Sequence, residues 1–244
     1  MALLQARGLT RSLPGKDGPV FSGIDISIEA GQVLFIKGPS GAGKTLLLRT
    51  VALLDPSEGG ALQLRGLAPT ETGIPAWRSE VTYVHQARVD FPGTPREFFD
   101  AARQLGTRRG RRAGDLAAVV ADMGLDPEVV LDQKWASLSG GQAQRVALAV
   151  AVALQPSVLL VDEPTSACDL DSARRVEAVL KGCGAAVIWV THDPGQPPRV
   201  GGRQLELPSG EVSEVELLEG DGEPPRPGST DGSERSGRRP WWRR

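Results

Sequence analysis

Residues 32–54, QVLFIKGPSGAGKTLLLRTVALL, join an apolar run, a glycine-rich turn and a second apolar segment. The run VLFI (33–36) is typical of a strand that is buried on both faces, and TLLLRTVALL (45–54) is typical of a helix. The turn between them, GPSGAGKT (38–45), has the spacing G-x-x-x-x-G-K-S/T. Its glycines allow backbone N–H groups to face a phosphate at the positive end of the helix dipole. This stretch therefore predicts an α/β fold with a nucleotide-binding turn.

Two side chains at the end of this turn carry its chemistry. Lys44 is expected to pair with β- and γ-phosphate oxygens, and the Thr45 hydroxyl to coordinate Mg²⁺. The alternative is a glycine-rich turn that matches the spacing by chance, and the flanking strand and helix argue against it. The predicted nucleotide-binding residues of the turn are Gly38, Pro39, Ser40, Gly41, Ala42, Gly43, Lys44 and Thr45.

The rest of the chain extends this α/β pattern. The apolar runs VLLV (158–161) and AVIWV (186–190) predict further strands of a parallel sheet that is covered by helices on both faces. Alternating residues in 20–28 and 61–66 predict half-exposed antiparallel strands. Helical patterns follow one another between about 87 and 156. The expected fold is a P-loop NTPase core, mostly a parallel sheet, with an antiparallel β margin and an inserted helical subdomain.

The same pattern sets the expected domain boundaries. The core is expected to cover residues 1–86 and 157–207, with the helical subdomain at about 87–156. From 208 to 244 the chain is rich in Gly, Pro, Ser and Glu. Such a composition cannot bury a core, so this tail is predicted to be disordered.

Composition and charge narrow the function classes. Lys and Arg total 28 and Asp and Glu 30, so the formal charge of −2 gives no reason to expect nucleic-acid binding. Two cysteines, Cys168 and Cys183, make no disulfide framework and favour a reducing compartment. No apolar window reaches the length of about 18 residues that a membrane span needs. We expect a soluble or peripheral protein.

Two carboxylates follow a buried strand directly in SVLLVDEPTSACD (157–169). A carboxylate at the end of a strand beside a phosphate-binding turn can hold Mg²⁺ through water, and Asp162 fits that role. The adjacent Glu163 fits a general base that polarises the attacking water. The alternative, an acidic pair that only marks the end of a strand, stays open from these residues alone.

Gln86 and His192 complete the expected catalytic set. His192 ends the apolar run AAVIWVTH (185–192), where it would face the γ-phosphate and the attacking water. Gln86 ends VTYVHQ (81–86), and its amide could reach Mg²⁺ or that water. Each residue alone would be unremarkable at a strand end. Together with Asp162 they predict one site.

In chain order, GPSGAGKT, Gln86, LSGGQ (138–142), LLVDEPTSACD (159–169) and His192 resemble the nucleotide-binding domain of ATP-binding cassette (ABC) proteins. The resemblance covers about residues 3–207. LSGGQ together with both phosphate-site motifs is far more specific than the phosphate-binding turn alone. The resemblance implies ATP and Mg²⁺ as cofactors and ATP hydrolysis as the activity.

The family resemblance also explains the second glycine-rich stretch, which opens the helix pattern 140–154. In this family two copies pair head to tail, and this turn contacts the γ-phosphate of the ATP that the other copy holds. Asp169 is assigned to communication between the two sites, and Arg145 matches an arginine that commonly follows LSGGQ. A capped glycine-rich helix without this role is the alternative. The implied contacts to the partner's ATP are Leu138, Ser139, Gly140, Gly141 and Gln142.

Two positions depart from the family pattern. The family usually places an aromatic residue after the first strand to stack on adenine, and here Leu13 occupies that place with Val20 alongside. The stretch that usually reads SALD is SACD, with Cys168 in place of leucine. We expect a mild packing effect from the cysteine, and weaker nucleotide affinity or base discrimination from the missing aromatic ring.

The resemblance implies an ATPase subunit at the cytoplasmic face of a membrane, acting as a homodimer on a separate transmembrane permease subunit. A finer resemblance is to a group that includes iron-export ATP-binding proteins of bacteria and a plant protein linked to aluminium tolerance. The alternatives are a soluble ABC ATPase of a non-transport complex, such as an iron–sulfur assembly scaffold, and a cassette that binds ATP only as a structural switch. The transported solute and the direction of transport stay open.

Three further segments carry weaker signals. RQLGTRRGRR (103–112) is a basic cluster, interpreted as a solvated loop or as a contact for a partner or anionic lipid. FPGTPREFF (91–99) is a candidate for docking the membrane partner. GRRPWWRR (237–244) either lies at a lipid headgroup layer or has no function.

Overall fold

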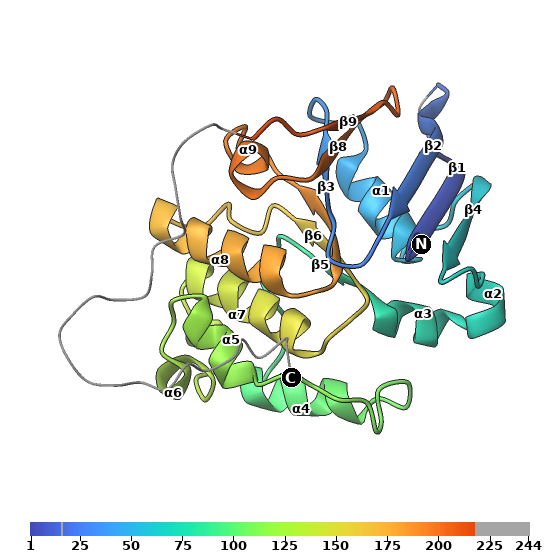
Figure 1. The fold of residues 1–244 in the computed structure, drawn as a ribbon. Helices are drawn as coiled ribbons and strands as arrows, with labels where there is room; N and C mark the ends of the chain where they lie inside the picture. Colours follow the sequence, from blue (N-terminus) through green and yellow to red (C-terminus); the bar gives the residue numbers. More distant parts are fainter. Residues whose placement is uncertain (16, 218–244) are drawn as a thin grey trace.

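The computed structural model describes residues 1–15 and 17–217, which form two β-sheets with helices packed around the larger one (Figure 1). The last eight residues of the chain, GRRPWWRR, lie outside the described residues. In chain order the strands are β1 (Leu4–Ser12), β2 (Pro19–Ile28), β3 (Val33–Lys37), β4 (Gly59–Leu64), β5 (Val81–Val84), β6 (Val158–Asp162), β7 (Ala186–Val190), β8 (Arg203–Glu206) and β9 (Val212–Glu214).

The apolar periodicity predicts the longest described helices and also the seven-residue helix Leu116–Asp122. The α-helices that it missed have four to seven residues, too few to show a helical period by themselves. In chain order the helices are α1 (Lys44–Val51), α2 (Pro69–Thr72), α3 (Ile74–Glu80), α4 (Pro95–Gln104), α5 (Leu116–Asp122), α6 (Pro127–Val130), the 3₁₀ helix η1 (Trp135–Ser137), α7 (Gly140–Ala153), α8 (Leu170–Gly182) and α9 (Gln196–Val200).

The larger sheet is mostly parallel. Its strand order is β5-β6-β7-β3-β8-β9, and only the β8–β9 pair is antiparallel. The smaller sheet, β2-β1-β4, is antiparallel throughout. The carboxyl ends of β3, β5, β6 and β7 therefore meet at one edge of the larger sheet. The predicted α/β fold with an antiparallel margin is confirmed.

Alternate residues of the central strands belong to two apolar clusters, one on each face of the larger sheet. In β3, Phe35 lies in one cluster with Trp189, while Leu34 lies in the other with Ile188. The first cluster also contains residues of α5, α7 and α8, and the second contains residues of α1 and the smaller sheet. Because side chains alternate along a strand, an unbroken apolar run is needed where both faces are covered.

The helical segment between residues 87 and 156 contains helices and no strand, as predicted. It does not have a core of its own, however. Met123 of α5 and Val146 of α7 share one apolar cluster with Leu159 of the sheet. The segment therefore forms part of the layer that covers the larger sheet.

The predicted tail begins too early. Val212 pairs with Leu205 and Glu214 with Arg203, so β9 extends the sheet beyond residue 207. The polar sequence hides this strand because all three of its residues are exposed at the edge of the sheet. Residues 218–244 of the predicted tail lie outside the described residues.

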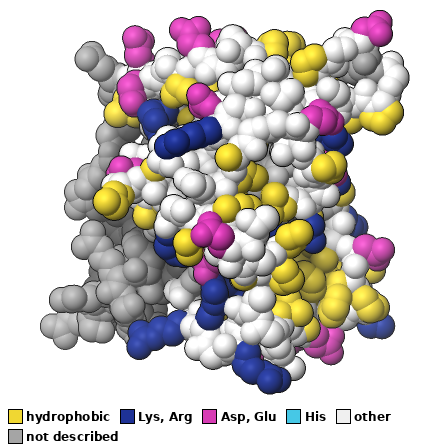
Figure 2. Space-filling model, turned by 90° about the vertical axis from the view of Figure 1, so that its right-hand side faces the viewer, with side chains coloured by type: hydrophobic (Ala, Val, Ile, Leu, Met, Phe, Trp, Pro, Cys, Tyr) yellow, Lys and Arg dark blue, Asp and Glu magenta, His cyan; other side chains and the backbone are white. Residues whose placement is uncertain are grey.

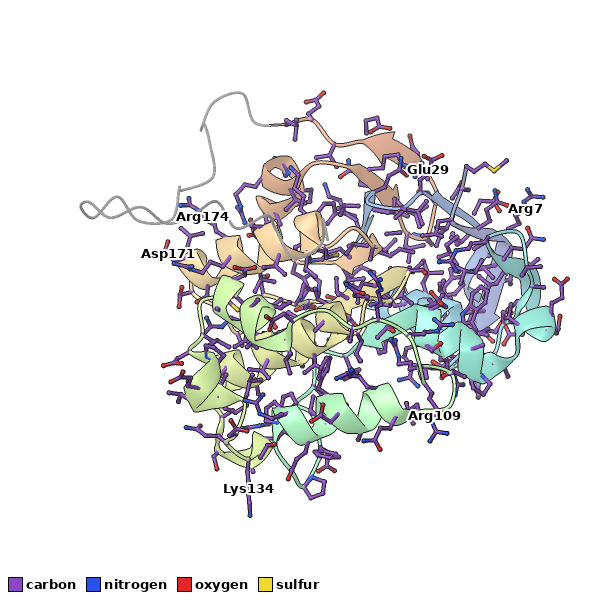
Figure 3. All side chains as sticks on the ribbon, turned by 60° about the horizontal axis from the view of Figure 1, so that its bottom comes forward. Arg7, Glu29, Arg109, Lys134, Asp171 and Arg174 are labelled. Carbon is purple, nitrogen blue, oxygen red and sulfur yellow. The ribbon has the colours of Figure 1, made fainter. Side chains whose placement is uncertain are left out.

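In the basic cluster at 103–112, one arginine, Arg108, is buried in the fold. Arg108 is 8 % exposed, and its guanidinium donates to the carbonyl oxygens of Leu154, at 2.7 Å, and of Ser79. Burial lowers the pKa of Arg108. Arg109, by contrast, points away from the fold (Figure 3). The interpretation of this segment as a wholly solvated loop is therefore wrong at Arg108.

The aromatic residues of segment 91–99 also face inward. Phe99 is buried, and the half-buried rings of Phe91 and Phe98 pack edge to face with their centroids 5.2 Å apart. Phe98 packs in turn against the buried Trp135, at 6.0 Å between centroids. These rings stabilise the first apolar cluster, which weakens their candidacy for docking another protein.

Within the described residues, no helix is long and apolar enough to cross a lipid bilayer. On the face that Figure 2 shows, basic and acidic side chains are interspersed, with hydrophobic ones grouped between them. That face therefore presents no extended patch of a single charge.

Candidate active site

The phosphate-binding turn connects β3 to α1 and depends on its glycines. Gly38, Gly41 and Gly43 have φ angles of 140°, 80° and 90°, a region that other residues rarely adopt. A Cβ atom at Gly43 would lie 2.7 Å from Val20 Cγ1, and one at Gly38 would lie 2.6 Å from the Leu207 carbonyl oxygen. Gly43 caps α1 without a side-chain hydrogen bond, which leaves the helix N-terminus open to an anion.

Lys44 lies inside this turn. Its side chain is largely buried, and Nζ donates to the carbonyl oxygens of Gly38, at 2.8 Å, and Pro39, at 3.0 Å. The ammonium group is therefore held in the concave side of the loop, where phosphate oxygens would also lie. This cradle of glycines with one enclosed cation fits a nucleotide phosphate.

Asp162, at the end of β6, lies beside the start of α1. Its Oδ2 accepts hydrogen bonds from Thr45 Oγ1 at 2.7 Å and from the Tyr83 hydroxyl at 3.2 Å. Burial raises the pKa of Tyr83, and the nearby Asp162 carboxylate raises it further, so the phenol stays a donor. A hydroxyl and a carboxylate in contact are a fitting oxygen set for Mg²⁺. Tyr83 was not predicted, and its only sequence signal is its place in the strand that leads to Gln86.

Glu163 meets both predicted partners. Its Oε1 lies 3.0 Å from His192 Nε2, and its Oε2 accepts a hydrogen bond of 3.2 Å from Gln86 Nε2. These side chains follow β6, β7 and β5, whose carboxyl ends meet at the same edge of the sheet. The structure thus brings together three of the residues that the sequence singled out, although their catalytic roles stay predictions.

The backbone of Glu163 is unusual. Its φ of 49° lies in the left-handed region, which costs a residue with a side chain about 1–2 kcal/mol. Its N–H donates to the Val190 carbonyl oxygen at 2.9 Å, and its own carbonyl oxygen accepts a 2.8 Å hydrogen bond from Gln144 Nε2. Neighbouring elements therefore hold the carboxylate in a conformation that the chain would not adopt by itself.

The LSGGQ stretch forms the start of α7. Ser139 caps the helix: its Oγ accepts from Gln142 N–H at 3.3 Å, and Gln142 Oε1 accepts from Ser139 N–H at 2.9 Å. Leu138 is buried, whereas Gly140 is exposed with open space at its Cβ position. In the described part of the chain, no hydrogen bond joins this stretch to residues 38–45.

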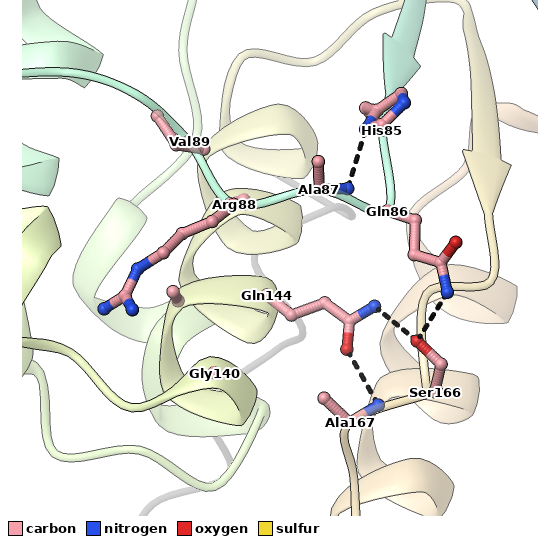
Figure 4. Close-up of a pocket in the computed structure, with 11 residues that line it drawn as sticks. His85, Gln86, Ala87, Arg88, Val89, Gly140, Gln144, Ser166 and Ala167 are labelled. Carbon is pink, nitrogen blue, oxygen red and sulfur yellow. Dashed lines mark hydrogen bonds between the residues drawn. The ribbon is translucent and has the colours of Figure 1, made fainter.

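A cavity of about 140 Å³ lies between the first turns of α7 and the segment that follows Gln86 (Figure 4). Arg88 is one of its lining residues and was not predicted. Its Nη2 donates to the carbonyl oxygens of Trp135, at 2.9 Å, and Ala136, at 3.2 Å, and it also contacts that of Leu138. Arg88 therefore ties the Gln86 segment to the turn that leads into α7.

The remaining predicted residues have different surroundings. Val20 lies against Gly43, whereas Leu13 is exposed in the connection between β1 and β2. Asp169 caps α8: its Oδ1 accepts from Ser172 N–H at 2.8 Å, and this bond lowers the pKa of Asp169. Arg145 donates to the Met123 carbonyl oxygen at 3.1 Å, at the end of α5.

Cys168 precedes Asp169 in the stretch SACD and is half-buried. Burial raises the pKa of its thiol. A neutral, half-buried thiol packs as a small apolar side chain, consistent with the mild effect expected from replacing leucine.

Comparison with protein families identifies one match: the family described as ABC transporter matches residues 21–166. Protein STAR1 of rice (Oryza sativa subsp. japonica) is 34 % identical over 218 residues, covering 87 % of this chain and 62 % of that protein. The Fe(3+) ions import ATP-binding protein FbpC 3 of Rhodococcus jostii is 34 % identical over 220 residues, covering 87 % and 61 %. The sn-glycerol-3-phosphate import ATP-binding protein UgpC 1 of Rhizobium johnstonii is 33 % identical over 225 residues, covering 88 % and 58 %. The chain thus spans about three fifths of the length of these relatives.

Solved structures share the fold. One, described as the ATP-binding subunit of an ABC transporter, superposes with a TM-score of 0.74 at 21 % identity, covering 87 % of this chain and 90 % of that one. Another, a dimeric ATP-binding cassette in a post-hydrolysis state bound to ADP and Pi, superposes with a TM-score of 0.72 at 24 % identity, covering 89 % and 100 %. At these identities the likeness concerns the fold alone.

Proposed function

This chain belongs to the ABC transporter family, and we propose that it binds and hydrolyses ATP to drive a transporter through a separate membrane-spanning subunit. The observation that carries the proposal is the position of the Glu163 carboxylate between His192 and Gln86, next to Asp162. A base at this place can orient and deprotonate a water molecule beside a bound phosphate. The names of similar proteins, ATP-binding proteins and subunits of transporters, support the coupling to transport.

Each residue has a defined task in this proposal. Lys44 and the backbone N–H groups of the turn hold the phosphates, and Thr45, Asp162 and Gln86 supply oxygen atoms for Mg²⁺, which neutralises phosphate charge when bound. Glu163 accepts the proton of the attacking water. His192 fixes the orientation of Glu163 through their 3.0 Å contact.

We propose further that two copies pair head to tail at the cytoplasmic face of a membrane. In this arrangement the first turn of α7 in each copy contacts the ATP held by the other, with Asp169 between the two sites. The exposure of Gly140, with open space at its Cβ position, supports this arrangement. A dimeric cassette among the structural neighbours adds support.

Metal-ion export, of iron in particular, is the narrower proposal for the transported solute. Among the similar proteins, the names of three include Fe(3+) ions import and that of another includes sn-glycerol-3-phosphate import. Iron as the solute thus has support from the names of relatives. Export rests on the sequence resemblance alone.

The first test is hydrolysis by the purified chain and its Glu163→Gln variant. The variant should bind ATP with unchanged affinity while turnover falls by at least about 100-fold, because the amide cannot accept the proton. Turnover that survives the substitution would remove Glu163 from the proposed role. No turnover in the wild-type chain would favour a cassette that binds ATP as a switch.

The second test identifies the partner. Tagged Glu163→Gln protein is purified with ATP from detergent-solubilised membranes, with Lys44→Ala protein as the control that should not hold ATP. A polytopic membrane protein in near-equal amount, present only with Glu163→Gln, supports the transporter. A soluble assembly factor in its place would support the iron–sulfur scaffold.

A further inference from the structure

Gln144 joins the start of α7 to the segment that follows Glu163. Its Nε2 donates to the Glu163 carbonyl oxygen at 2.8 Å and to Ser166 Oγ at 3.3 Å, while its Oε1 accepts from Ala167 N–H at 3.2 Å. Figure 4 shows the side chain spanning the gap between the two elements. The amide therefore uses both its donor end and its acceptor end on one short stretch of backbone.

Ser166 extends this connection toward Gln86. Its hydroxyl donates to the Glu163 carbonyl oxygen at 3.1 Å and accepts from Gln86 Nε2 at 3.5 Å as well as from Gln144. Gln86 also donates to the Glu163 carboxylate. Gln144 and Gln86 thus reach Glu163 from opposite ends, one at its main chain and the other at its side chain.

The main chain of Glu163 needs such support. With φ at 49° it lies in a strained region, and the direction of its side chain depends on that angle. Its carbonyl oxygen accepts three hydrogen bonds: the shortest comes from Gln144 Nε2 at 2.8 Å, and the other two come from Ser166, from Oγ at 3.1 Å and from N–H at 3.2 Å. We expect the loss of the shortest bond to loosen this peptide unit, and with it the direction of the carboxylate toward His192.

The two elements also touch directly. A Cβ atom at Gly141 would lie 2.6 Å from the Ala167 carbonyl oxygen, so the first turn of α7 and the segment after Glu163 approach backbone to backbone. Gln144 lies in the next turn of the same helix. A shift of the first turn of α7 would therefore press on the backbone that follows Glu163.

We propose that Gln144 is a positioning residue that couples the first turn of α7 to the orientation of Glu163 in the same chain. The inference rests on the proposed function, in which that turn contacts the ATP of a second copy. Contact of Ser139 and Gly140 with the partner's nucleotide then favours the orientation of this chain's own hydrolytic carboxylate. One side chain would link the closure of the pair to hydrolysis.

The test compares wild-type protein with Gln144→Met, which keeps the length of the side chain but has no hydrogen-bonding groups. We expect turnover of ATP to fall about tenfold through misplacement of the base, with KM and ATP affinity within about twofold of wild type. Gln144→Glu keeps an acceptor for Ala167 N–H but loses both donors, and should lose turnover to a similar degree. Gln104→Met, at the exposed end of α4, is the matched control and should behave as wild type.

A second measurement does not depend on turnover. In hydrogen exchange without nucleotide, the amide of Ala167 should exchange faster in Gln144→Met than in wild type, because its acceptor is gone. Amides of the strand β7, which Gln144 does not contact, should be unchanged.

Three outcomes overturn the inference. One is wild-type turnover in Gln144→Met, and another is unchanged exchange at Ala167. The third is a joint fall of ATP affinity, turnover and unfolding temperature, which would make Gln144 a structural residue only. An inactive wild-type chain would instead reject the proposed function, and the coupling with it.

Discussion

The two glycine-rich turns of this molecule both open a helix, yet their surroundings differ. In the turn at 38–45, Lys44 Nζ donates to the carbonyl oxygens of Gly38 and Pro39 in the same turn, and the Thr45 hydroxyl donates to Asp162. The turn at 138–142 caps α7 with a reciprocal pair of hydrogen bonds and leaves Gly140 exposed. The polar side chains of the first turn are hydrogen-bonded within the chain, whereas the second turn leaves the first residue of its helix exposed.

The residue that caps each helix explains this difference. Gly43 offers no side chain, so the N–H groups at the start of α1 have no side-chain cap. Ser139 and Gln142 each satisfy one backbone N–H, which makes α7 stable without a ligand. Glycine-rich sequence alone therefore does not distinguish a phosphate cradle from a capped helix.

The largest effect on ATP turnover should come from a substitution in the turn at 38–45. Lys44→Ala removes the enclosed cation, and we expect turnover to fall by at least about 100-fold together with a loss of ATP affinity. Both quantities can be measured with purified protein, by phosphate release and by titration calorimetry. Retained affinity would mean that the backbone of the turn holds the phosphates without the lysine.

Substitutions at Ser139 separate capping from phosphate contact in the open turn. Ser139→Asp keeps a good helix cap, so the unfolding temperature should stay near that of wild type. If the turn faces the partner's ATP, the added negative charge should reduce turnover by at least about tenfold while a single copy binds ATP normally. Ser139→Ala is the companion variant and should cost about 1 kcal/mol of stability. Normal turnover in Ser139→Asp would leave this turn as a cap only.

The neighbouring glycines provide a matched pair. Gly141→Ala would force a Cβ atom to 2.6 Å from the Ala167 carbonyl oxygen, so we expect a stability loss of about 1–3 kcal/mol. Gly140→Ala meets open space and should stabilise the isolated chain by up to about 1 kcal/mol through helix propensity. Thermal or urea unfolding measures both. Equal stability of the two variants would contradict the close approach of α7 to Ala167.

The smallest effect concerns the base of the nucleotide. Leu13 is exposed and has no aromatic ring, so Leu13→Tyr should raise ATP affinity by about 2- to 10-fold through stacking. The wild-type chain should bind ATP and GTP with similar affinity. A strong preference of wild type for ATP, measured by competition, would show that another residue recognises adenine.

The local sequence predicted the buried strands of the larger sheet correctly. The runs in β3, β6 and β7 could be placed because a strand buried on both faces has no polar position to interrupt it. Edge elements were harder to place. The strand β9 is exposed and polar, and it forms because the neighbouring β8 offers unpaired backbone groups.

The sequence also could not predict the surroundings of long polar side chains. Arg108 and Arg109 are adjacent and chemically identical, yet one is buried against carbonyl groups and the other is exposed. Arg88 and Gln144 have no periodicity or motif of their own. Arg88 donates to backbone carbonyl groups 47 to 50 residues away, and Gln144 contacts two backbone groups and a hydroxyl 19 to 23 residues away; such partners leave no mark in the sequence.

The sequence by itself determined the fold class, and it singled out the glycine-rich turn at 38–45 and the set Gln86, Asp162, Glu163 and His192 as the predicted site. It could do so because glycine spacing, unbroken apolar strands and the residues that end them follow from local geometry. Only the tertiary structure decided how Glu163 is held: its left-handed backbone is maintained by hydrogen bonds to Val190 and Gln144. Those partners come from different elements, and the energy that keeps a strained residue in place exists only once the elements have packed.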